Sequence, residues 1–463
     1  MKNLTPIMIS GKEVLPLVEG GKGINGSDGR SSGAWAHENC VGTFSGVCPD
    51  SYDDMGNLIS EAFYKITRRD RQSEMVEHAI KGGVAQAQIA HEVSGGNGRI
   101  HMNMLWESGG SEQILTGVLE RTKGMLHGIT SGAGLPYKLG EITSKFGVYY
   151  YPIVSSARAF QVLWKRAYNN FKEFLGGIVY EDPWLAGGHL GLSNAENPSV
   201  PETPYQRLVE LRKTMNALGL EETPIILAGG IWSLAEWQDY IDNPEIGKIA
   251  FQFGTRPMIT KESPISEAWK KIMLNVKKGD VILQRFSPTG FFSSAIKNTF
   301  LERLLERKNG EVAFANELEG EFNTALAISP TKNIYIKAED ATKAKAQIDQ
   351  GYTEIKETPD NTVVFMTKEE WDKQQIDRKD CVGCLSACQF SSWSQAQGNT
   401  GRKPDPRSYC IHKTLYEVGH GGSVKDHLLF AGHQVYRFAT DPLYREGCIP
   451  SVKELIEKIK RGE

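Results

Sequence analysis

The first half of the chain alternates short apolar runs with longer stretches in which apolar residues recur every three or four positions. "LGGIVYED" (175–182) and "TPIILAGG" (223–230) are apolar without strict alternation. This pattern is typical of parallel strands that are buried on both faces. Residues 57–93 and 204–218 show helical spacing instead. The expected strands are residues 13–21, 40–47, 98–105, 126–134, 147–156, 175–182, 223–230 and 248–255.

Eight strands that alternate with helices over this length predict an α/β fold, a (β/α)8 TIM barrel. We assign residues 1–310 to this barrel. An open, doubly wound sheet is the alternative, and "GKGING" (21–26) matches the G-x-G-x-x-G pattern that it uses for dinucleotides. That interpretation requires a helix directly after the loop, whereas "SDGRSSGAW" (27–35) is rich in Gly and Ser and predicts a loop. The barrel is therefore favoured.

A second, smaller α/β pattern follows the barrel. "NIYIK" (333–337) and "TVVFM" (362–366) predict strands, and each precedes a helical stretch. We therefore predict a small α/β insertion at residues 311–378, followed by a Cys-rich segment at residues 379–463. The chain ends in a predicted helix within "SVKELIEKIKRGE".

Composition excludes several classes of function. The chain has 463 residues, of which 40% are hydrophobic and 24% charged, as in an ordinary globular enzyme. A net charge of −3 gives no bulk attraction for nucleic acid. The basic stretches 65–72 and 164–168 are interpreted as solvated helix faces, with docking of an acidic carrier protein as the alternative. The first residues lack the apolar core of a secretory signal, and no run of 18 apolar residues occurs. We therefore expect a cytoplasmic protein without a membrane or nucleic-acid partner.

Two Gly-rich stretches follow the last two predicted strands. They are "ILAGGIW" (226–232) and "FQFGTRP" (251–257). TIM barrels commonly bind phosphate at these two loops, and glycine lets the backbone approach a ligand closely. The predicted phosphate-binding residues are Gly229, Gly230, Gly254 and Thr255.

A candidate catalytic residue follows the sixth strand. "DPWLAGGHLG" (182–191) places His189 beside Gly187 and Gly188, which suit close approach to a flat ligand. Histidine is the side chain best suited to proton transfer near neutral pH. A single histidine is more often structural, but this one lies where barrel enzymes collect catalytic groups. Further candidates for binding the same ligand are Gly20, Gly21, Asn103, Ser131, Gly132 and Ser156.

The seven cysteines are too few for a disulfide scaffold in a chain of this length. Three of them form a C-x2-C-x3-C pattern, and a fourth follows after 21 intervening residues. Structural zinc sites usually pair two C-x2-C motifs, or one such motif with histidines. A three-plus-one pattern favours a [4Fe–4S] cluster, although zinc at the same thiols, with His412 as a further ligand, remains open. The candidate metal ligands are Cys381, Cys384, Cys388 and Cys410.

Four motifs resemble those of the nitronate monooxygenase (2-nitropropane dioxygenase-like) family of FMN-dependent TIM-barrel enzymes. They are "AGGHLG", "IILAGGIW", "FQFGTRPMITKES" and "FSPTGFFSSAIKN", and the resemblance spans nearly the whole barrel. It implies that FMN is bound with its phosphate at Gly230, Gly254 and Thr255. It also implies that His189 acts as an acid or base beside the flavin.

Further motifs resemble one branch of that family, the bacterial acyl-carrier-protein dehydrogenase/isomerases. These motifs are "SGAGLP", "PIVSSARAFQVLWKRA", the cysteine cluster and "SYCI". The branch implies a [4Fe–4S] cluster on the four C-terminal cysteines, and a segment with Gly432 and Tyr436 near the active site. This chain departs from the branch in its shorter first cysteine gap, in its longer spacing before Cys410 and in its insertion at 330–378.

Three enzymatic hypotheses follow from the resemblance. In the first, His189 removes the α-proton of an acyl thioester and FMN accepts the β-hydride. The second is oxidation of alkyl nitronates with O2, and the third is NAD(P)H-dependent reduction of enoyl thioesters. A non-enzymatic flavin/iron–sulfur redox sensor is a fourth hypothesis, and the cluster would be an electron relay or a structural clamp. The partners considered are a small-molecule or acyl-thioester substrate, acyl carrier protein, O2 or another electron acceptor, and a second copy of the chain in a homodimer.

Overall fold

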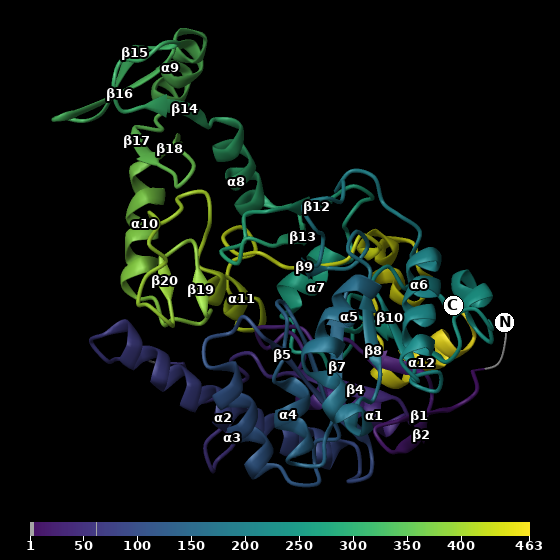
Figure 1. Cartoon of the computed structure of the whole chain (residues 1–463). Helices are drawn as coiled ribbons and strands as arrows, with labels where there is room; N and C mark the ends of the chain where they lie inside the picture. The colour runs from purple at the N-terminus through teal and green to yellow at the C-terminus, as the bar shows by residue number, and fades with distance from the viewer. Residues whose placement is uncertain (1–3, 62) are drawn as a thin grey trace.

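The computed structural model describes residues 4–61 and 63–463. Its main body is a closed barrel of eight parallel strands that is surrounded by helices (Figure 1). The strands pair in chain order, and the last one pairs with the first to close the barrel. The predicted TIM barrel is confirmed, and each predicted range contains one barrel strand. These strands are β3 (Leu17–Glu19), β4 (Val41–Ser45), β5 (Arg99–Leu105), β6 (Gly128–Gly132), β7 (Tyr149–Val154), β8 (Ile178–Glu181), β10 (Ile225–Ala228) and β11 (Ile249–Phe253).

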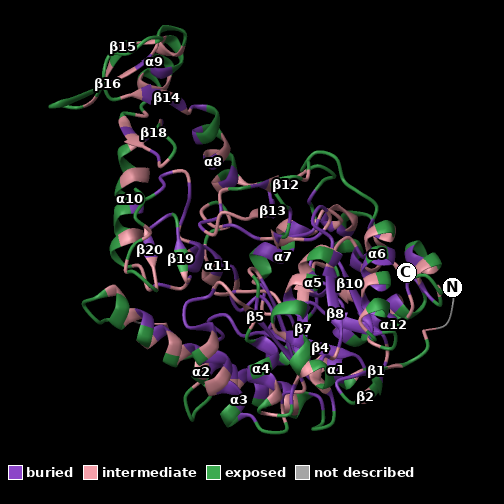
Figure 2. Cartoon of the chain, viewed as in Figure 1, coloured by how far each residue is buried: buried purple, intermediate pink, exposed green. Residues whose placement is uncertain are grey.

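The barrel strands are buried on both faces (Figure 2). Side chains such as Val41, Val179 and Ile226 fill the barrel interior, while a larger apolar cluster lies between the strands and the helices. This double burial is the reason that the strands are continuous apolar runs. An antiparallel hairpin also contributes to the interior cluster, and its strands are β1 (Ile7–Ile9) and β2 (Lys12–Val14).

The chain's last helix packs against the first one in the ring around the barrel. Helix α12 (Val452–Lys460) contacts α1 (Gly29–His37), and its Leu455 and Ile459 join the same core cluster as Trp35. The C-terminus therefore completes the barrel wall. The other elements around the barrel are α2 (Arg68–Val93), α3 (Ser111–Arg121), α4 (Leu139–Ser144), α5 (Ala157–Arg166), η1 (Tyr168–Phe174), α6 (Pro204–Ala217), η2 (Leu234–Tyr240), η3 (Arg256–Met258) and α7 (Glu267–Met273).

Helix α1 contradicts the loop predicted for residues 27–35. Asp28 caps the helix by accepting a hydrogen bond from the Ser31 amide at 2.9 Å. Helix α1 contains glycines because α2 packs very closely against it: a Cβ at Gly29 would lie 2.4 Å from the carbonyl oxygen of Gln86. The G-x-G-x-x-G loop is therefore followed by a helix after all. The doubly wound alternative fails for a different reason, namely that the sheet is a closed barrel.

Helix α2 is shorter than the predicted range 57–93. It begins at Arg68, after the capping residue Thr67. The basic stretch 65–72 is a solvated face only in part: Lys65 and Arg69 are exposed, whereas Arg68 and Arg71 are half-buried. Arg68 donates to the carbonyl of Ser391 at 3.2 Å, and Arg71 donates to the carbonyl of Cys381 at 3.1 Å. These side chains anchor the Cys-rich segment to the barrel.

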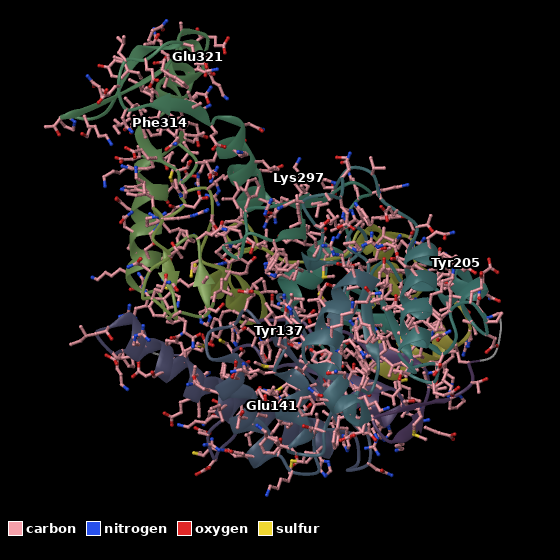
Figure 3. All side chains as sticks on the ribbon, in the orientation of Figure 1. Tyr137, Glu141, Tyr205, Lys297, Phe314 and Glu321 are labelled. Atoms are coloured by element: carbon pink, nitrogen blue, oxygen red, sulfur yellow. The ribbon has the colours of Figure 1, made fainter. Side chains whose placement is uncertain are left out.

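A small five-stranded sheet stands away from the barrel, beyond α8 (Thr299–Asn309) and α10 (Lys368–Lys379) (Figure 1). It has its own core, which includes Phe314, whereas Glu321 lies at its outer end (Figure 3). In spatial order its strands are β15 (Phe322–Ser329), β16 (Lys332–Lys337), β14 (Val312–Ala315), β18 (Thr362–Met366) and β17 (Glu354–Glu357), accompanied by η4 (Ala338–Asp340) and α9 (Ala341–Asp349).

The remaining elements lie between the small sheet and the barrel or on the barrel itself. A three-stranded sheet has the order β12-β13-β9. The remaining elements are β9 (Gly188–Leu190), β12 (Val281–Gln284), β13 (Phe292–Ile296), β19 (Ala387–Cys388), β20 (Trp393–Ser394), α11 (Ile411–Gly419), η5 (Val435–Ala439) and η6 (Pro442–Gly447).

Within the described residues, no helix has both the length and the apolar character needed to cross a membrane.

Candidate active site

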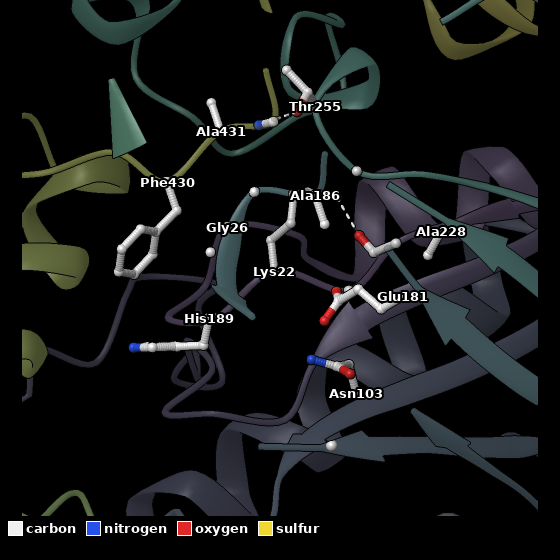
Figure 4. Close-up of a pocket in the computed structure, with 18 of the residues that line it drawn as sticks. Lys22, Gly26, Asn103, Glu181, Ala186, His189, Ala228, Thr255, Phe430 and Ala431 are labelled. Atoms are coloured by element: carbon white, nitrogen blue, oxygen red, sulfur yellow. Dashed lines mark hydrogen bonds between the residues drawn. The ribbon is translucent and has the colours of Figure 1, made fainter. Parts of the chain in front are cut away.

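A cavity of about 230 Å³ lies at the carboxyl ends of the barrel strands (Figure 4). Its wall comes from the loops after several barrel strands and from the C-terminal segment. The cavity brings His189 together with most of the predicted cofactor-binding residues. Those lining it are Gly20, Gly21, Asn103, Gly132, Gly187, Gly188, Gly229, Gly230, Gly254 and Thr255.

Two predicted cofactor residues lie outside the cavity wall. Ser131 lies between Thr130, which donates to Asn103 inside the barrel, and Gly132, which lines the cavity. Because side chains alternate along a strand, Ser131 faces the surrounding helices. Ser156 caps helix α5, where its hydroxyl accepts a hydrogen bond from the Ala159 amide at 3.3 Å.

His189 is held on a short strand rather than on a free loop. Strand β9 pairs with β13, and His189 lies opposite Ser293. Its Nε2 lies 2.6 Å from the hydroxyl of Ser287, which lies 2.9 Å from that of Thr289. Burial lowers the pKa of His189 to about 4, so the ring is neutral at neutral pH and can accept a proton. Sequence reasoning missed Ser287, although it lies in the "FSPTGFF" motif.

The loops after β10 and β11 form a cradle of small residues. Gly229 and Gly230 have φ of +99° and +74°, which favour glycine. At Gly254, by contrast, an added Cβ would meet no heavy atom within 4 Å. The fold itself therefore does not require glycine there, and the space beside it is part of the cavity. Thr255 accepts a hydrogen bond from the Gly432 amide at 2.9 Å.

Sequence reasoning also missed two ionisable residues of the cavity wall. Glu181 is the last residue of β8, and burial raises its pKa to about 8. Lys22 donates to the carbonyl of Gly20 at 2.6 Å and lies 3.4 Å from the buried carboxylate of Glu19. Figure 4 shows Glu181 and Asn103 across the cavity from His189. Glu181 was detectable as the polar end of an otherwise apolar strand.

The C-terminal segment covers the cavity. Phe430 contacts the ring of His189 edge-on, with ring centroids 5.1 Å apart. A Cβ at Gly187 would lie 2.5 Å from the Gly432 amide, which explains a glycine at that position. Gly432 lines the cavity, as the resemblance implied, whereas Tyr436 is not among the lining residues.

All four predicted metal ligands line a second cavity of about 40 Å³. Burial raises the pKa of the Cys384, Cys388 and Cys410 thiols to about 12. Cys384 lines both cavities, so the two sites share a wall.

The thiol cavity is distinct from another group of potential metal ligands. Among the described residues, the one group of three Cys, His, Asp or Glu ligand atoms within 4.8 Å of one another is Cys48, Glu61 and His412. The four cysteines of the thiol cavity are not part of that group.

The nitronate monooxygenase family model matches residues 118–365, more than half of the chain. The chain belongs to the nitronate monooxygenase family. It is therefore an FMN-type oxidoreductase, as predicted. The match includes His189 and the loops after β8, β10 and β11, and so covers these parts of the cavity wall.

Three solved structures are similar to this chain at low sequence identity, and two of them share the fold over nearly its whole length. The enoyl reductase domain of MlnA from Bacillus amyloliquefaciens is 12% identical, with 97% of this chain and 93% of that chain covered and a TM-score of 0.57. FabK from Thermotoga maritima is 13% identical, with coverages of 96% and 92% and a TM-score of 0.50. Nitroalkane oxidase from Streptomyces ansochromogenes is 13% identical, with coverages of 65% and 79% and a TM-score of 0.43. No curated protein sequence matches the chain.

We expect Gly254→Val to weaken FMN binding by about tenfold or more, roughly 1.4 kcal/mol, without unfolding the protein. The new side chain would project into cavity space rather than into protein atoms. Flavin fluorescence titration of the apoprotein measures the affinity. Gly419→Ala is the matched control, since its Cβ would meet only one atom, at 3.6 Å, outside the cavity wall. Equal affinity in Gly254→Val and wild type would contradict a phosphate site at this loop.

We expect Glu181→Gln to flatten the pH dependence of apoprotein stability. The folded-state pKa of about 8 lies above the ordinary value of 4.5, so the folded protein binds more protons than the unfolded chain between these values. Wild-type stability should therefore fall as pH rises from 5 to 8, by at most about 1.4 kcal/mol per pH unit. Urea denaturation at several pH values measures this slope. An unchanged slope in the variant would show that Glu181 does not titrate there.

Proposed function

We propose that this family member interconverts saturated and α,β-unsaturated acyl thioesters, with FMN at the cradle and His189 moving the proton. The observation that carries the proposal is one cavity that joins this histidine, the glycine cradle and an apolar wall. FMN, when bound, supplies hydride chemistry. The likeness to the enoyl reductase domain of MlnA extends over 97% of this chain, which supports the same reaction class.

The apolar wall suits an acyl chain. Ile411, Leu415 and Val418 recur along one face of α11 and line the cavity with Met258 and Ile265. Burial of hydrocarbon against such a wall stabilises a complex by about 25 cal/mol per Å². A small nitroalkane anion would leave this surface uncovered.

His189 is placed to move a proton at the carbon next to the thioester carbonyl. Its neutral ring accepts the α-proton in the oxidative direction and returns it in the reductive direction. The hydrogen-bonded hydroxyls of Ser287 and Thr289 orient the ring through Nε2. The cover formed by the 428–434 segment restricts water access to the reacting carbon.

We also propose that Cys381, Cys384, Cys388 and Cys410 hold a [4Fe–4S] cluster. Their three-plus-one spacing favours a cluster over zinc, which usually takes two Cys-x2-Cys motifs or one such motif with histidines. The cavity of about 40 Å³ also exceeds the roughly 10–15 Å³ that one water molecule needs. Cys384 would link the cluster to the flavin cavity, which favours an electron relay.

Anaerobic reduction of the bound flavin by different donors tests the proposal. Rapid bleaching by a saturated acyl thioester indicates the dehydrogenase direction. Bleaching by NAD(P)H, with reoxidation by an enoyl thioester, indicates the reductase direction. The family match favours alkyl nitronate oxidation as the second candidate. Bleaching by an alkyl nitronate alone would replace the acyl-thioester proposal with that function.

A further inference from the structure

A third group of metal-binding side chains lies between the barrel and helix α11. Cys48 and Glu61 belong to the connection from β4 to α2, and His412 lies in the first turn of α11. One ligand atom from each lies within 4.8 Å of the other two. Cys48 is 3% exposed and His412 is 6% exposed, and the Glu61 side chain is 8% exposed. The group therefore lies away from bulk water.

Protein contacts leave several donor atoms of this group unused. His412 Nε2 lies 2.6 Å from Glu61 Oε2, but Glu61 Oε1 and His412 Nδ1 are buried without a hydrogen-bond partner. The Cys48 sulfur lies 3.5 Å from that of Met75, which is a weak acceptor. A buried carboxylate is costly unless its charge is compensated. The His412 imidazole compensates one carboxylate oxygen and also contacts the Cys48 thiol, which leaves the other oxygen without a partner.

We propose that Cys48, Glu61 and His412 bind a Zn²⁺ ion. Zinc accepts thiolate, imidazole and carboxylate ligands in a tetrahedral site, and three protein ligands leave one further position. Copper(I) would prefer an all-soft ligand set, which the carboxylate disfavours. Water completes the coordination. The buried Nε2 of the neighbouring His78 also lacks a partner, and Phe63 contacts the rings of both His78 and His412.

The ion would stabilise one wall of the flavin cavity. Val47 precedes Cys48 and Ile411 precedes His412, and both Val47 and Ile411 line that cavity. The Cys48 and His412 ligands are 364 positions apart in the chain. A single ion would thus fasten α11 to the connection after β4, independently of the reaction that the enzyme performs.

Metal analysis of the full-length protein tests the site. Wild type, Cys48→Ala and Glu61→Gln are purified anaerobically, equilibrated with zinc chloride and desalted, and zinc, iron and sulfide are measured per chain. We expect about one zinc in wild type and its loss in both variants, with iron and sulfide unchanged. Cys40→Ala is the matched control because Cys40 is also a buried thiol, in the core beside Trp35, and it should retain zinc.

Two results would overturn the proposal. One is a wild type that retains no zinc after equilibration. The other is zinc that persists in Cys48→Ala and Glu61→Gln but is lost in Cys381→Ala, since the ion would then occupy the four-thiol cavity. Glu61→Gln keeps the size of the side chain and a hydrogen-bond acceptor for His412. Circular dichroism of this variant separates loss of the ion from loss of the fold.

Discussion

Replacing His189 by alanine should lower turnover by about 10²- to 10⁴-fold while FMN stays bound. His189 is the proposed proton-moving group in the cavity, whereas the cradle that would hold the phosphate lies on the β10 and β11 loops. Steady-state kinetics and flavin content of the same preparation separate the two effects. His37→Ala, which alters an exposed histidine on α1, is the control and should retain full turnover. Full turnover in His189→Ala would remove this residue from the mechanism.

The pH profile provides an independent check on the same residue. Burial lowers the pKa of His189 to about 4, so the neutral form is present throughout the range above that value. The kcat/KM of the proton-abstracting direction should therefore stay level from pH 7 to 5 and fall only as pH approaches 4. An ordinary histidine would lose its base form near pH 6.5.

Ser287→Ala removes the hydrogen bond to His189 Nε2 and should lower kcat roughly tenfold, because the imidazole ring loses its orientation.

Cys384→Ala should abolish iron and sulfide binding while FMN remains. A [4Fe–4S] cluster needs four thiolate ligands, and Cys384 also forms part of the flavin cavity wall. Iron and sulfide analysis after anaerobic purification measures the loss, and electron transfer from reduced flavin to an external acceptor should slow in parallel. Cys448→Ala is the control, since Cys448 is an exposed thiol outside the cavity. Wild-type protein that contains zinc without sulfide at the four cysteines would contradict the cluster.

The barrel and much of the site were predictable from local patterns. Each strand is a short apolar run because it is buried on both faces, and this signal depends on a few consecutive residues. The chemistry of a TIM barrel collects where its strands end. Gly230 and Gly254 lie at the ends of β10 and β11, and His189 lies in the segment after β8. Their places in the chain were enough to predict one shared site, and they do line one cavity. Ser156 follows a strand too, but local capping of α5 uses its hydroxyl instead.

The errors and omissions concern contacts between distant segments. Gly29 looked like a loop residue because its reason for being glycine, the close approach of Gln86, lies 57 positions away. Arg71 looked solvated because its partner, the Cys381 carbonyl, is 310 positions away.

The features of the whole molecule fall into two groups, those set by local sequence and those set by tertiary packing. Burial and backbone geometry act on neighbouring residues, so strands, turns and the Cys-x2-Cys-x3-Cys pattern are visible in the chain itself. The packing of α12 on α1, the cover over the cavity and the meeting of Cys48, Glu61 and His412 depend on how separate segments fold against one another. The periodicity of the sequence does not predict such long-range contacts, because the distance between two segments depends on how all the residues between them pack.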